Sequence, residues 1–236
     1  MCKDILPVCP DGLWLEQTPK GLVLTDGQLT FMGDFTECLP RLKQNNLSGE
    51  LIVKAAKKSK SASPLLLDAT AGMGEDSLLL ARAGYRVRLY ERNPVIAALL
   101  RDTIERAKKH PQLSDIVDRM EVYAEDSISA MQVMAEAEGV RPNVILLDPM
   151  FPKRSKSGLI KKKFQLLQKL ESPCSEQSAE EMLAAALTLK PERIIIKRPL
   201  KGPYLADKKP DYSIGGKAIR YDCILPGSHT RTDLKS

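Results

Sequence analysis

The chain has 236 residues, 43% of them hydrophobic, which suits one α/β domain with a modest extension and a sizeable core. Its apolar runs are far shorter than the roughly 20 residues of a membrane helix, and its first residues lack a signal-peptide pattern, so we expect a cytoplasmic protein outside membranes. The formal net charge of +6 is compatible with a polyanionic partner but does not by itself require one.

Cysteine and histidine usage argues against two further classes of protein. The five cysteines are scattered and form no Cys-x-x-Cys pair, which indicates reduced thiols and not a disulfide framework. The two histidines, His110 and His229, lie near no cluster of cysteines, so we expect no zinc or other metal site. Neither histidine follows a nucleophile elbow, which disfavours Ser-His-Asp chemistry.

Short alternating apolar runs occupy residues 1–33. Asp26-Gly27 separates two of these runs, and Asp-Gly between apolar runs is a hairpin signal. We therefore predict a small antiparallel meander, which forms a β-rich extension over residues 1–48. This extension serves either as a structural cap or as part of the substrate site.

From residue 49 onward, helical and strand patterns alternate. We expect strands at 65–68, 85–91, 119–123, 143–147 and 193–197 and a terminal hairpin at 214–225. We expect helices at 49–57, 76–83, 94–109, 128–138, 160–170 and 178–189, the last opened by a capping box of Ser178 and Glu181. Strands that alternate with helices predict a doubly wound, Rossmann-like parallel sheet over residues 49–227, followed by a flexible tail at 228–236.

A loop of small residues follows the first of these strands. Three leucines and Asp68 form a buried strand, and Ala-Thr-Ala-Gly-Met-Gly then leads into a helix. Gly72 and Gly74 permit positive φ angles and let a ligand approach the backbone closely. The N–H groups that open the helix then face whatever ligand lies in the crevice.

The charges of this loop favour S-adenosylmethionine (SAM) over a dinucleotide. A dinucleotide fold has a third glycine where this chain has Ser77, and Asp68, Glu75 and Asp76 would repel a pyrophosphate. SAM carries a sulfonium, an α-amino group and no phosphate. We expect Asp68 and the two glycines to hold its amino-acid end, with Glu75 and Asp76 lining the same loop. A purely structural turn is the remaining alternative.

Acidic residues end several of the predicted strands. Asp68, Glu91, Asp126 and Asp148 all fall at carboxyl ends, which meet at one edge of a parallel sheet, so they should surround one crevice. Taken singly, each is equally a helix N-cap or a turn residue.

Two of these acids are placed for the nucleoside part of SAM. Glu91 follows the second strand, where an acid accepts both ribose hydroxyls, and Arg92 beside it either neutralises that acid or packs on the adenine. Asp126 and Ser127 follow the third strand and are placed for the adenine amine and ring.

Asp148-Pro149-Met150-Phe151 resembles the (Asp/Asn/Ser)-Pro-Pro-(Tyr/Phe/Trp) motif of methyltransferases that act on exocyclic amines. Such an amine is a poor nucleophile, because its lone pair is conjugated with the base ring. Asp148 and the carbonyl of Pro149 would accept its N–H groups, and Phe151 would stack on the base. The structural alternative is a proline turn with a core phenylalanine.

A basic segment follows this motif directly. We expect phosphate contacts from its lysines and arginine, or alternatively a solvated face. Arg198 is expected either to contact phosphate at the same rim or to pair with a carboxylate. The candidate RNA contacts are Lys153, Arg154, Lys156, Lys161, Lys162, Lys163, Lys197 and Arg198.

Together, these motifs resemble the ribosomal RNA small-subunit methyltransferase J family from about residue 49 to residue 225. The matching stretches are Asp68–Gly74, Glu91–Pro94, Asp148–Pro152, Lys197–Pro199 and Arg220–Asp222. Met150 departs from the general amine motif but fits this family's own Asp-Pro-Met-Phe-Pro.

The resemblance implies SAM-dependent methylation of a guanine N2 in small-subunit (16S) rRNA. The partner would be that rRNA or the small ribosomal subunit, and no metal would take part. The resemblance also implies SAM contacts at Glu75, Asp76, Glu91, Arg92, Asp126, Ser127 and Asp148.

Two rival functions stay open at this point. One is methylation of an adenine amine in nucleic acid, or of a small molecule. The other is a catalytically silent RNA-binding module of ribosome assembly, which would bind RNA in a salt-sensitive way without affinity for SAM.

Overall fold

The computed structural model describes residues 6–57, 59, 61–149, 162–170 and 175–227, without the side chains of residues 162–164. The tail predicted at 228–236 lies outside the described residues. A three-stranded antiparallel sheet near the N-terminus and a separate seven-stranded sheet contain the described strands. Within the described ranges, no helix has the length and apolar character needed to cross a bilayer.

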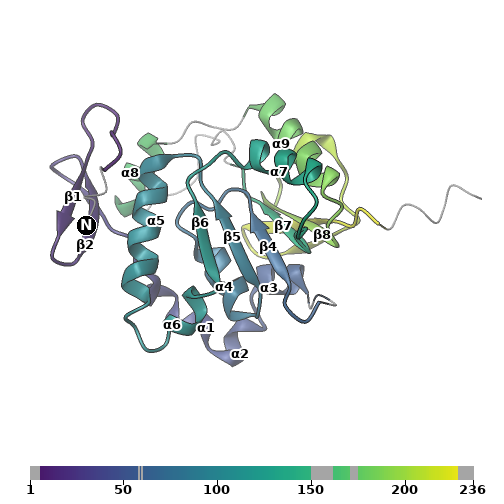
Figure 1. Cartoon of the computed structure of the whole chain (residues 1–236), viewed down its shortest axis with the longest axis horizontal. Coiled ribbons are helices and arrows are strands. Elements are labelled where there is room, and N and C mark those ends of the chain that lie inside the picture. The colour runs from purple at the N-terminus through teal and green to yellow at the C-terminus, as the bar shows by residue number, and fades with distance from the viewer. Residues whose placement is uncertain (1–5, 58, 60, 150–161, 171–174, 228–236) are drawn as a thin grey trace, which may run out of the picture.

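The larger sheet has the order β6-β5-β4-β7-β8-β10-β9 (Figure 1). Its first five strands are parallel, and β10 is antiparallel to both β8 and β9. The chain order reverses between β4 and β7, and this switch point is where doubly wound sheets bind ligands. The predicted Rossmann-like sheet is confirmed. The strands are β4 (Leu65–Asp68), β5 (Arg86–Tyr90), β6 (Met120–Tyr123), β7 (Val144–Leu147), β8 (Arg193–Pro199), β9 (Tyr212–Gly215) and β10 (Ile219–Ile224).

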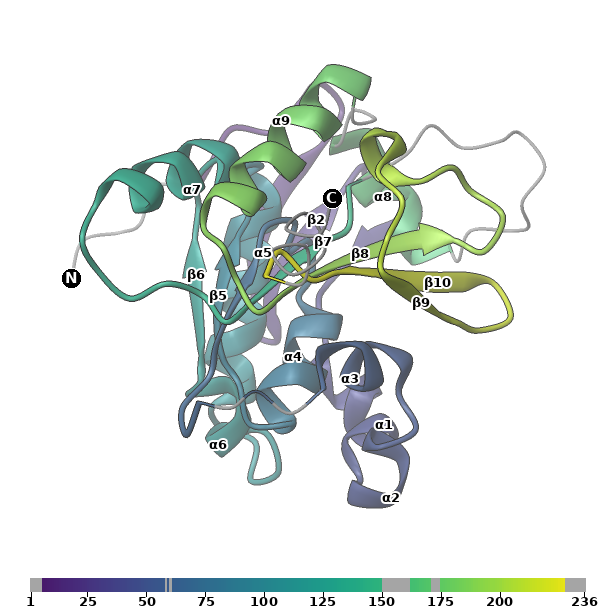
Figure 2. The same ribbon diagram turned by 90° about the vertical axis from the view of Figure 1, so that its right-hand side faces the viewer.

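Helices cover both faces of this sheet because its central strands are apolar on both sides. Leu66 of β4 belongs to one core with α3 and α4, and Leu67 belongs to another core with α9. Figure 2 shows α7 and α9 on one side of the sheet and α3 and α4 on the other. The helices are α3 (Leu51–Ala56), α4 (Glu75–Arg82), α5 (Pro94–Ala107), α6 (Ser114–Val117), α7 (Ser127–Glu136), α8 (Lys162–Leu170), α9 (Glu176–Thr188) and the 3-10 turn η2 (Leu205–Asp207).

The N-terminal meander predicted from Asp26-Gly27 is confirmed. It consists of β1 (Trp14–Thr18), β2 (Gly21–Thr25) and β3 (Thr30–Phe31) and lies beside α5, away from the large sheet (Figure 1). Leu24 and Phe31 share a core with Val95 of α5 and Leu166 of α8. Lys169 of α8 forms an ion pair with Asp26 at 2.7 Å, and this contact lowers the pKa of Asp26 to about 2.

Residues 35–47 form the short helices η1 (Phe35–Cys38), α1 (Leu39–Leu42) and α2 (Gln44–Leu47). Phe35, Cys38, Leu42 and Leu47 belong to the same core as α3 and α4. This stretch therefore packs in the core of the large sheet.

The start of α9 corrects one sequence prediction. The N-cap is Ser175, whose hydroxyl oxygen accepts the N–H of Ser178 at 3.1 Å. An N-cap must precede the first helical residue, which is Glu176, so Ser178 lies inside the helix. The predicted capping box was displaced by one helical turn.

Two glycines of the loop between β4 and α4 differ in their surroundings. Gly74 is the N-cap of α4 with φ +73°, and a Cβ added there would lie 2.9 Å from Leu100 Cδ1. Gly72 has φ +51°, but an added Cβ would meet nothing within 4 Å. Only Gly74 is needed for packing as well as for backbone conformation.

We expect Gly74→Ala to lower the free energy of unfolding by about 2–4 kcal/mol, because backbone strain adds to overpacking. The matched variant Gly72→Ala should cost only about 1–2 kcal/mol, from backbone strain alone. Urea denaturation measures both values. Equal losses in the two variants would contradict this account of Gly74.

Candidate functional site

A buried carboxylate lies where β4 passes into the glycine loop. Asp68 ends β4 and is 3% exposed. Its Oδ1 accepts the N–H of Thr70 at 3.1 Å, and its Oδ2 accepts the hydroxyl of Ser77 at 2.6 Å. Burial raises the pKa of Asp68 to about 7, although both hydrogen bonds oppose that shift. Asp68 thereby ties the strand, the loop and the first turn of α4 together.

The contacts of the loop differ from those of a dinucleotide site. Ser77, in place of a third glycine, is fully buried and satisfies Asp68 with its hydroxyl. The N–H of Gly72 donates to Glu91 Oε2 at 2.9 Å, so it is not directed at a pyrophosphate. Both contacts fit a loop whose ligand carries no phosphate.

Glu91 follows β5 and is 6% exposed. Its second oxygen, Oε1, accepts the N–H of Asn93 at 2.8 Å. Burial raises the pKa of Glu91, and the hydrogen bonds from Asn93 and Gly72 oppose that shift. A carboxylate oxygen has two lone pairs and can accept two hydrogen bonds. Each oxygen of Glu91 therefore has a lone pair left for a ribose hydroxyl.

A cavity of about 490 Å³ opens at the carboxyl ends of β4, β5 and β7. Its volume lies in the range of small-molecule sites, which is about 300–1,000 Å³. Six predicted site residues line it: Glu91, Arg92, Asp126, Ser127, Asp148 and Pro149. Three carboxylates against one guanidinium favour a cationic ligand over a polyanion. The residues present therefore fit SAM.

Asp126 and Ser127 form one wall of this cavity at the start of α7. Asp126 is the N-cap of that helix, and its Oδ1 accepts the N–H of Ser129 at 2.9 Å. Asp126 therefore caps the helix and also lines the cavity, and its contact with the adenine stays a prediction. Tyr90, which also lines the cavity, stacks on Tyr123 with ring centroids 4.8 Å apart.

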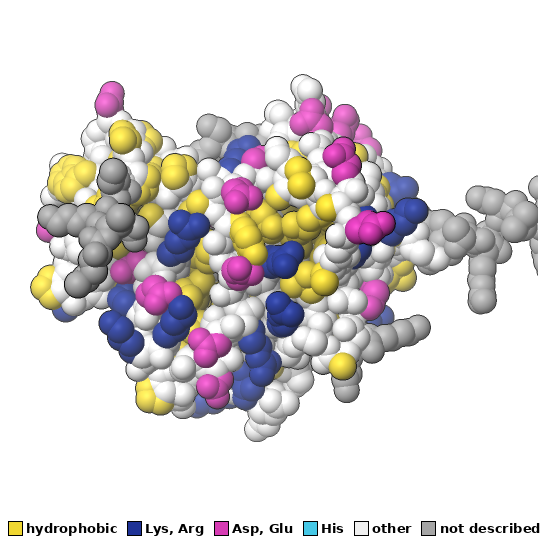
Figure 3. Space-filling model, in the orientation of Figure 1, with side chains coloured by type: hydrophobic (Ala, Val, Ile, Leu, Met, Phe, Trp, Pro, Cys, Tyr) yellow, Lys and Arg dark blue, Asp and Glu magenta, His cyan; other side chains and the backbone are white. Residues whose placement is uncertain are grey.

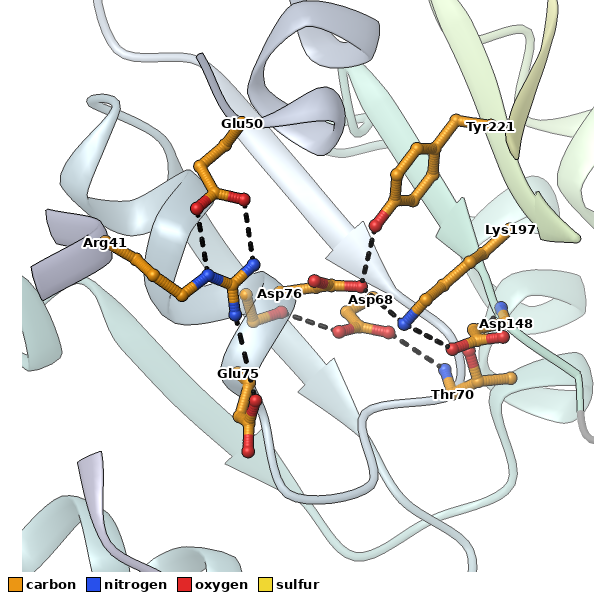
Figure 4. Close-up of polar contacts among 10 residues, drawn as sticks. Arg41, Glu50, Asp68, Thr70, Glu75, Asp76, Asp148, Lys197 and Tyr221 are labelled. Carbon is orange, nitrogen blue, oxygen red and sulfur yellow. Dashed lines mark hydrogen bonds and ion pairs between the residues drawn. The ribbon is translucent and has the colours of Figure 1, made fainter. Parts of the chain in front are cut away.

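Asp148 lies beside a group of charged and polar side chains from three other elements (Figure 4). Lys197 Nζ of β8 is 3.0 Å from Asp148 Oδ2 and 2.8 Å from Asp76 Oδ2 in the first turn of α4. The hydroxyl of Tyr221 on β10 donates to the same Asp76 oxygen at 3.3 Å. The backbone N–H of Asp148 donates to Thr70 Oγ1 at 2.7 Å.

The opposite charges of Lys197, Asp148 and Asp76 stabilise one another in their ionised forms. Burial raises the pKa of Asp148, and the Lys197 ammonium opposes that rise. Burial alone would lower the pKa of Lys197, but Asp148 and Asp76 outweigh it and the pKa is raised. Lys197 is therefore a firmly charged cation between two anions.

Not every predicted SAM contact reaches the cavity. Asp68, Gly72, Gly74 and Asp76 are not among the residues that line it; they lie at the end of β4, in the loop and in the first turn of α4. Glu75 is 47% exposed and lies 3.8 Å from the guanidinium of Arg41, outside the cavity (Figure 4).

The predicted RNA contacts have three different outcomes. Lys197 lies in the carboxylate cluster, and Arg198 is only 1% exposed, with its Nε donating to the carbonyl of Pro203 at 2.7 Å. The structure corrects the expected position of Arg198: β8 is a central strand, so this side chain lies inside the protein. Phe151 and the remaining basic candidates lie outside the described side chains: Lys153, Arg154, Lys156, Lys161, Lys162 and Lys163.

Several residues near the site escaped sequence reasoning. Thr70 binds the backbone of Asp148, Tyr221 binds Asp76, and Met182 and Ser178 of α9 line the cavity. The available signals were the hydroxyl of Thr70 between Asp68 and the glycines, and the position of Tyr221 within the family-like stretch Arg220–Asp222. Within the ranges that the structure describes, no group of His, Cys, Asp and Glu is arranged to hold a metal ion.

The pKa of Asp68 gives a prediction for stability against pH. The pKa of Asp68 is about 7 in the folded protein and near 4 in the unfolded chain. Its contribution to the free energy of unfolding is therefore fully present below about pH 4 and is lost as the pH rises to about 7. Relative to Asp68→Asn, wild-type stability should therefore fall between pH 4 and pH 7, by at most about 1.4 kcal/mol per pH unit. Urea denaturation of both proteins at several pH values measures the difference. Parallel pH profiles would show that Asp68 ionises normally.

Comparison with known proteins identifies the family. A family model described as "Putative SAM-dependent methyltransferase" matches residues 11–226. Ribosomal RNA small subunit methyltransferase J of Pseudomonas paraeruginosa is 42% identical over 182 residues, which are 77% of this chain and 68% of that protein. The protein of the same name from Dechloromonas aromatica is 43% identical over 182 residues, 77% of this chain and 72% of that protein.

A solved structure agrees with these relatives. The crystal structure of a SAM-dependent methyltransferase from Neisseria gonorrhoeae matches with a TM-score of 0.74 at 29% identity, covering 94% of this chain and 86% of that chain. The match spans the N-terminal meander as well as the large sheet, because it covers nearly the whole chain. With its cavity, its glycine loop and these relatives, the chain belongs to the ribosomal RNA small subunit methyltransferase J family of SAM-dependent methyltransferases.

Proposed function

We propose that this protein methylates the exocyclic N2 of a guanine in small-subunit (16S) rRNA, in the cytoplasm. The observation that carries the proposal is Asp148-Pro149 at the carboxyl end of β7, lining the cavity that fits SAM. Its relatives at 42% and 43% identity are named as methyltransferases of small-subunit rRNA, which supports the choice of substrate.

The cavity residues divide the binding of SAM among them. Glu91 accepts the ribose hydroxyls, Asp126 and Ser127 contact the adenine, and Arg92 flanks the same wall. Ala69 and Thr70, which line the cavity just before the Gly72–Gly74 loop, lie near the amino-acid end of SAM, and Asp68 and Glu91 hold the backbone there. When bound, SAM supplies a methyl group that its positively charged sulfur makes electrophilic.

Asp148 and Pro149 hold the target amine. The Asp148 side chain is 41% exposed, so a base can reach it, and its carboxylate accepts one N–H of the amine. The carbonyl of Pro149 accepts the other N–H. Two acceptors would fix the nitrogen and direct its lone pair to the methyl group, which accelerates transfer by orientation. As the N–C bond forms, the S–C bond of SAM would break, S-adenosylhomocysteine would leave, and the extra proton of the amine would pass to water at the exposed Asp148 side chain. Phe151 stacks on the base in this proposal.

Electrostatic contacts with RNA phosphates come from the basic segment after Asp148. Figure 3 shows one face of the molecule, where basic and acidic side chains are interspersed over the sheet. The proposal for the basic segment rests on its charge and on its position in the sequence directly after the Asp148 motif. The residues proposed for it are Lys153, Arg154, Lys156, Lys161, Lys162 and Lys163.

The product distinguishes this function from its rivals. Small ribosomal subunits from cells that lack the gene, incubated with labelled SAM and the protein, should yield labelled N2-methylguanosine after nucleoside digestion and mass spectrometry. Label in an adenosine derivative would overturn the guanine assignment. Binding of RNA without any binding of SAM would instead indicate a silent assembly module.

We expect Asp148→Ala to lower kcat by about 100-fold or more, because one of two acceptors for the amine is lost. The dissociation constant for SAM, measured by calorimetry, should change by less than about threefold, since Glu91 and Ser127 remain. Asp115→Ala, at an exposed position of α6, is the matched control and should retain wild-type activity. Near-normal kcat in Asp148→Ala would remove Asp148 from the mechanism.

A further inference from the structure

Lys197 connects three elements that are distant in sequence. Its Nζ on β8 contacts Asp76 in the first turn of α4 at 2.8 Å and Asp148 after β7 at 3.0 Å. The side chain is 27% exposed, so both ion pairs are partly shielded from water. Tyr221 of β10 donates to Asp76 and keeps that carboxylate in place (Figure 4).

The ammonium counteracts a strong repulsion. Asp76 and Asp148 both contact the same nitrogen atom, so the two carboxylates lie close together, and Asp68 on β4 adds a third acid. Like charges at such separations favour protonation of one member. A protonated Asp148 would carry a hydrogen on its carboxyl group and would be a weaker acceptor for an amine N–H.

The contacts also leave one oxygen of Asp148 unused by the described residues. The ammonium of Lys197 contacts Oδ2 of Asp148. The backbone N–H of Asp148 donates to Thr70 Oγ1. Among the described residues, no hydrogen bond or ion pair uses Oδ1 of Asp148. Among the described residues, the carboxylate is thus anchored at one oxygen, and its side chain is 41% exposed.

We propose that Lys197 is a positioning residue for methyl transfer, which holds Asp148 ionised and in one orientation toward the target amine. The inference rests on the proposed function of Asp148. It assigns Lys197 to the carboxylate cluster, whereas the sequence suggested a phosphate contact. An ammonium already shared by two carboxylates is a poor ligand for RNA phosphate, because a phosphate would have to displace an existing ion pair.

The first test observes Asp148 without substrate. The carboxyl carbon of Asp148 in ¹³C-labelled protein, assigned through Asp148→Asn, is titrated by NMR in wild type, Lys197→Met and Lys197→Arg. The titratable and charged groups that face Asp148 are Asp68, Asp76, Lys197, Arg198 and Tyr221. Lys197→Met removes only the ammonium from this set and leaves the other four groups in place. We expect the Asp148 pKa to rise by about one unit or more in Lys197→Met and to stay near the wild-type value in Lys197→Arg.

The second test follows catalysis. The acidic limb of the kcat profile should move to higher pH in Lys197→Met by the same amount as the NMR titration, so that kcat on that limb falls about tenfold for each unit by which the Asp148 pKa rises. The Michaelis constant for small subunits should change by less than about threefold. Lys54→Met, at an exposed site on α3, should match wild type throughout.

The outcomes separate the alternatives. An unchanged Asp148 pKa in Lys197→Met, with the fold verified by thermal denaturation, would overturn the proposal. A raised Michaelis constant for subunits with unchanged kcat would identify Lys197 as a phosphate contact and also overturn it. If Lys197→Met does not fold, Lys197→Gln takes its place in the titration. Failure of wild type to methylate subunits would overturn the proposed function, while the NMR titration would still decide the role of Lys197.

Discussion

The hydrogen bonds of Asp68 hold the two halves of the site together. Its buried carboxylate accepts the N–H of Thr70 and the hydroxyl of Ser77, which fixes the glycine loop and the start of α4. The hydroxyl of the same Thr70 accepts the backbone N–H of Asp148 on the neighbouring strand. The cofactor loop and the target-amine residue are therefore positioned by one carboxylate, at the switch point where ligands bind.

The electrostatics of the site follow from how its acids are compensated. Glu91 is satisfied by backbone N–H groups, Asp126 by the start of α7, and Asp76 and Asp148 by one ammonium. Backbone donors stabilise a carboxylate without adding a formal positive charge, so the cavity remains negative overall. That balance suits a sulfonium and an amine, and it disfavours a phosphate-bearing cofactor.

The N-terminal meander supports the site from outside the large sheet. It packs on α5, whose N-cap Asn93 donates to the carbonyl of Leu170 at the end of α8. Lys169 of α8 is also paired with Asp26 of the meander. These contacts hold the extension against α5 and α8. The division of the chain near residue 48 stays a prediction.

The sequence by itself determined the features that depend on local pattern. The alternation of strands and helices, the Asp-Gly hairpin, the glycine loop and the acids at strand ends were all readable, because period and turn chemistry act over a few residues. The SAM contacts and RNA contacts remain proposals. Only the tertiary structure decided that Arg198 is buried, that Ser77 satisfies Asp68, and that Lys197 bridges two acids. Burial and charge pairing depend on neighbours brought together by the sheet order, and Lys197 meets Asp76 across 121 residues of chain.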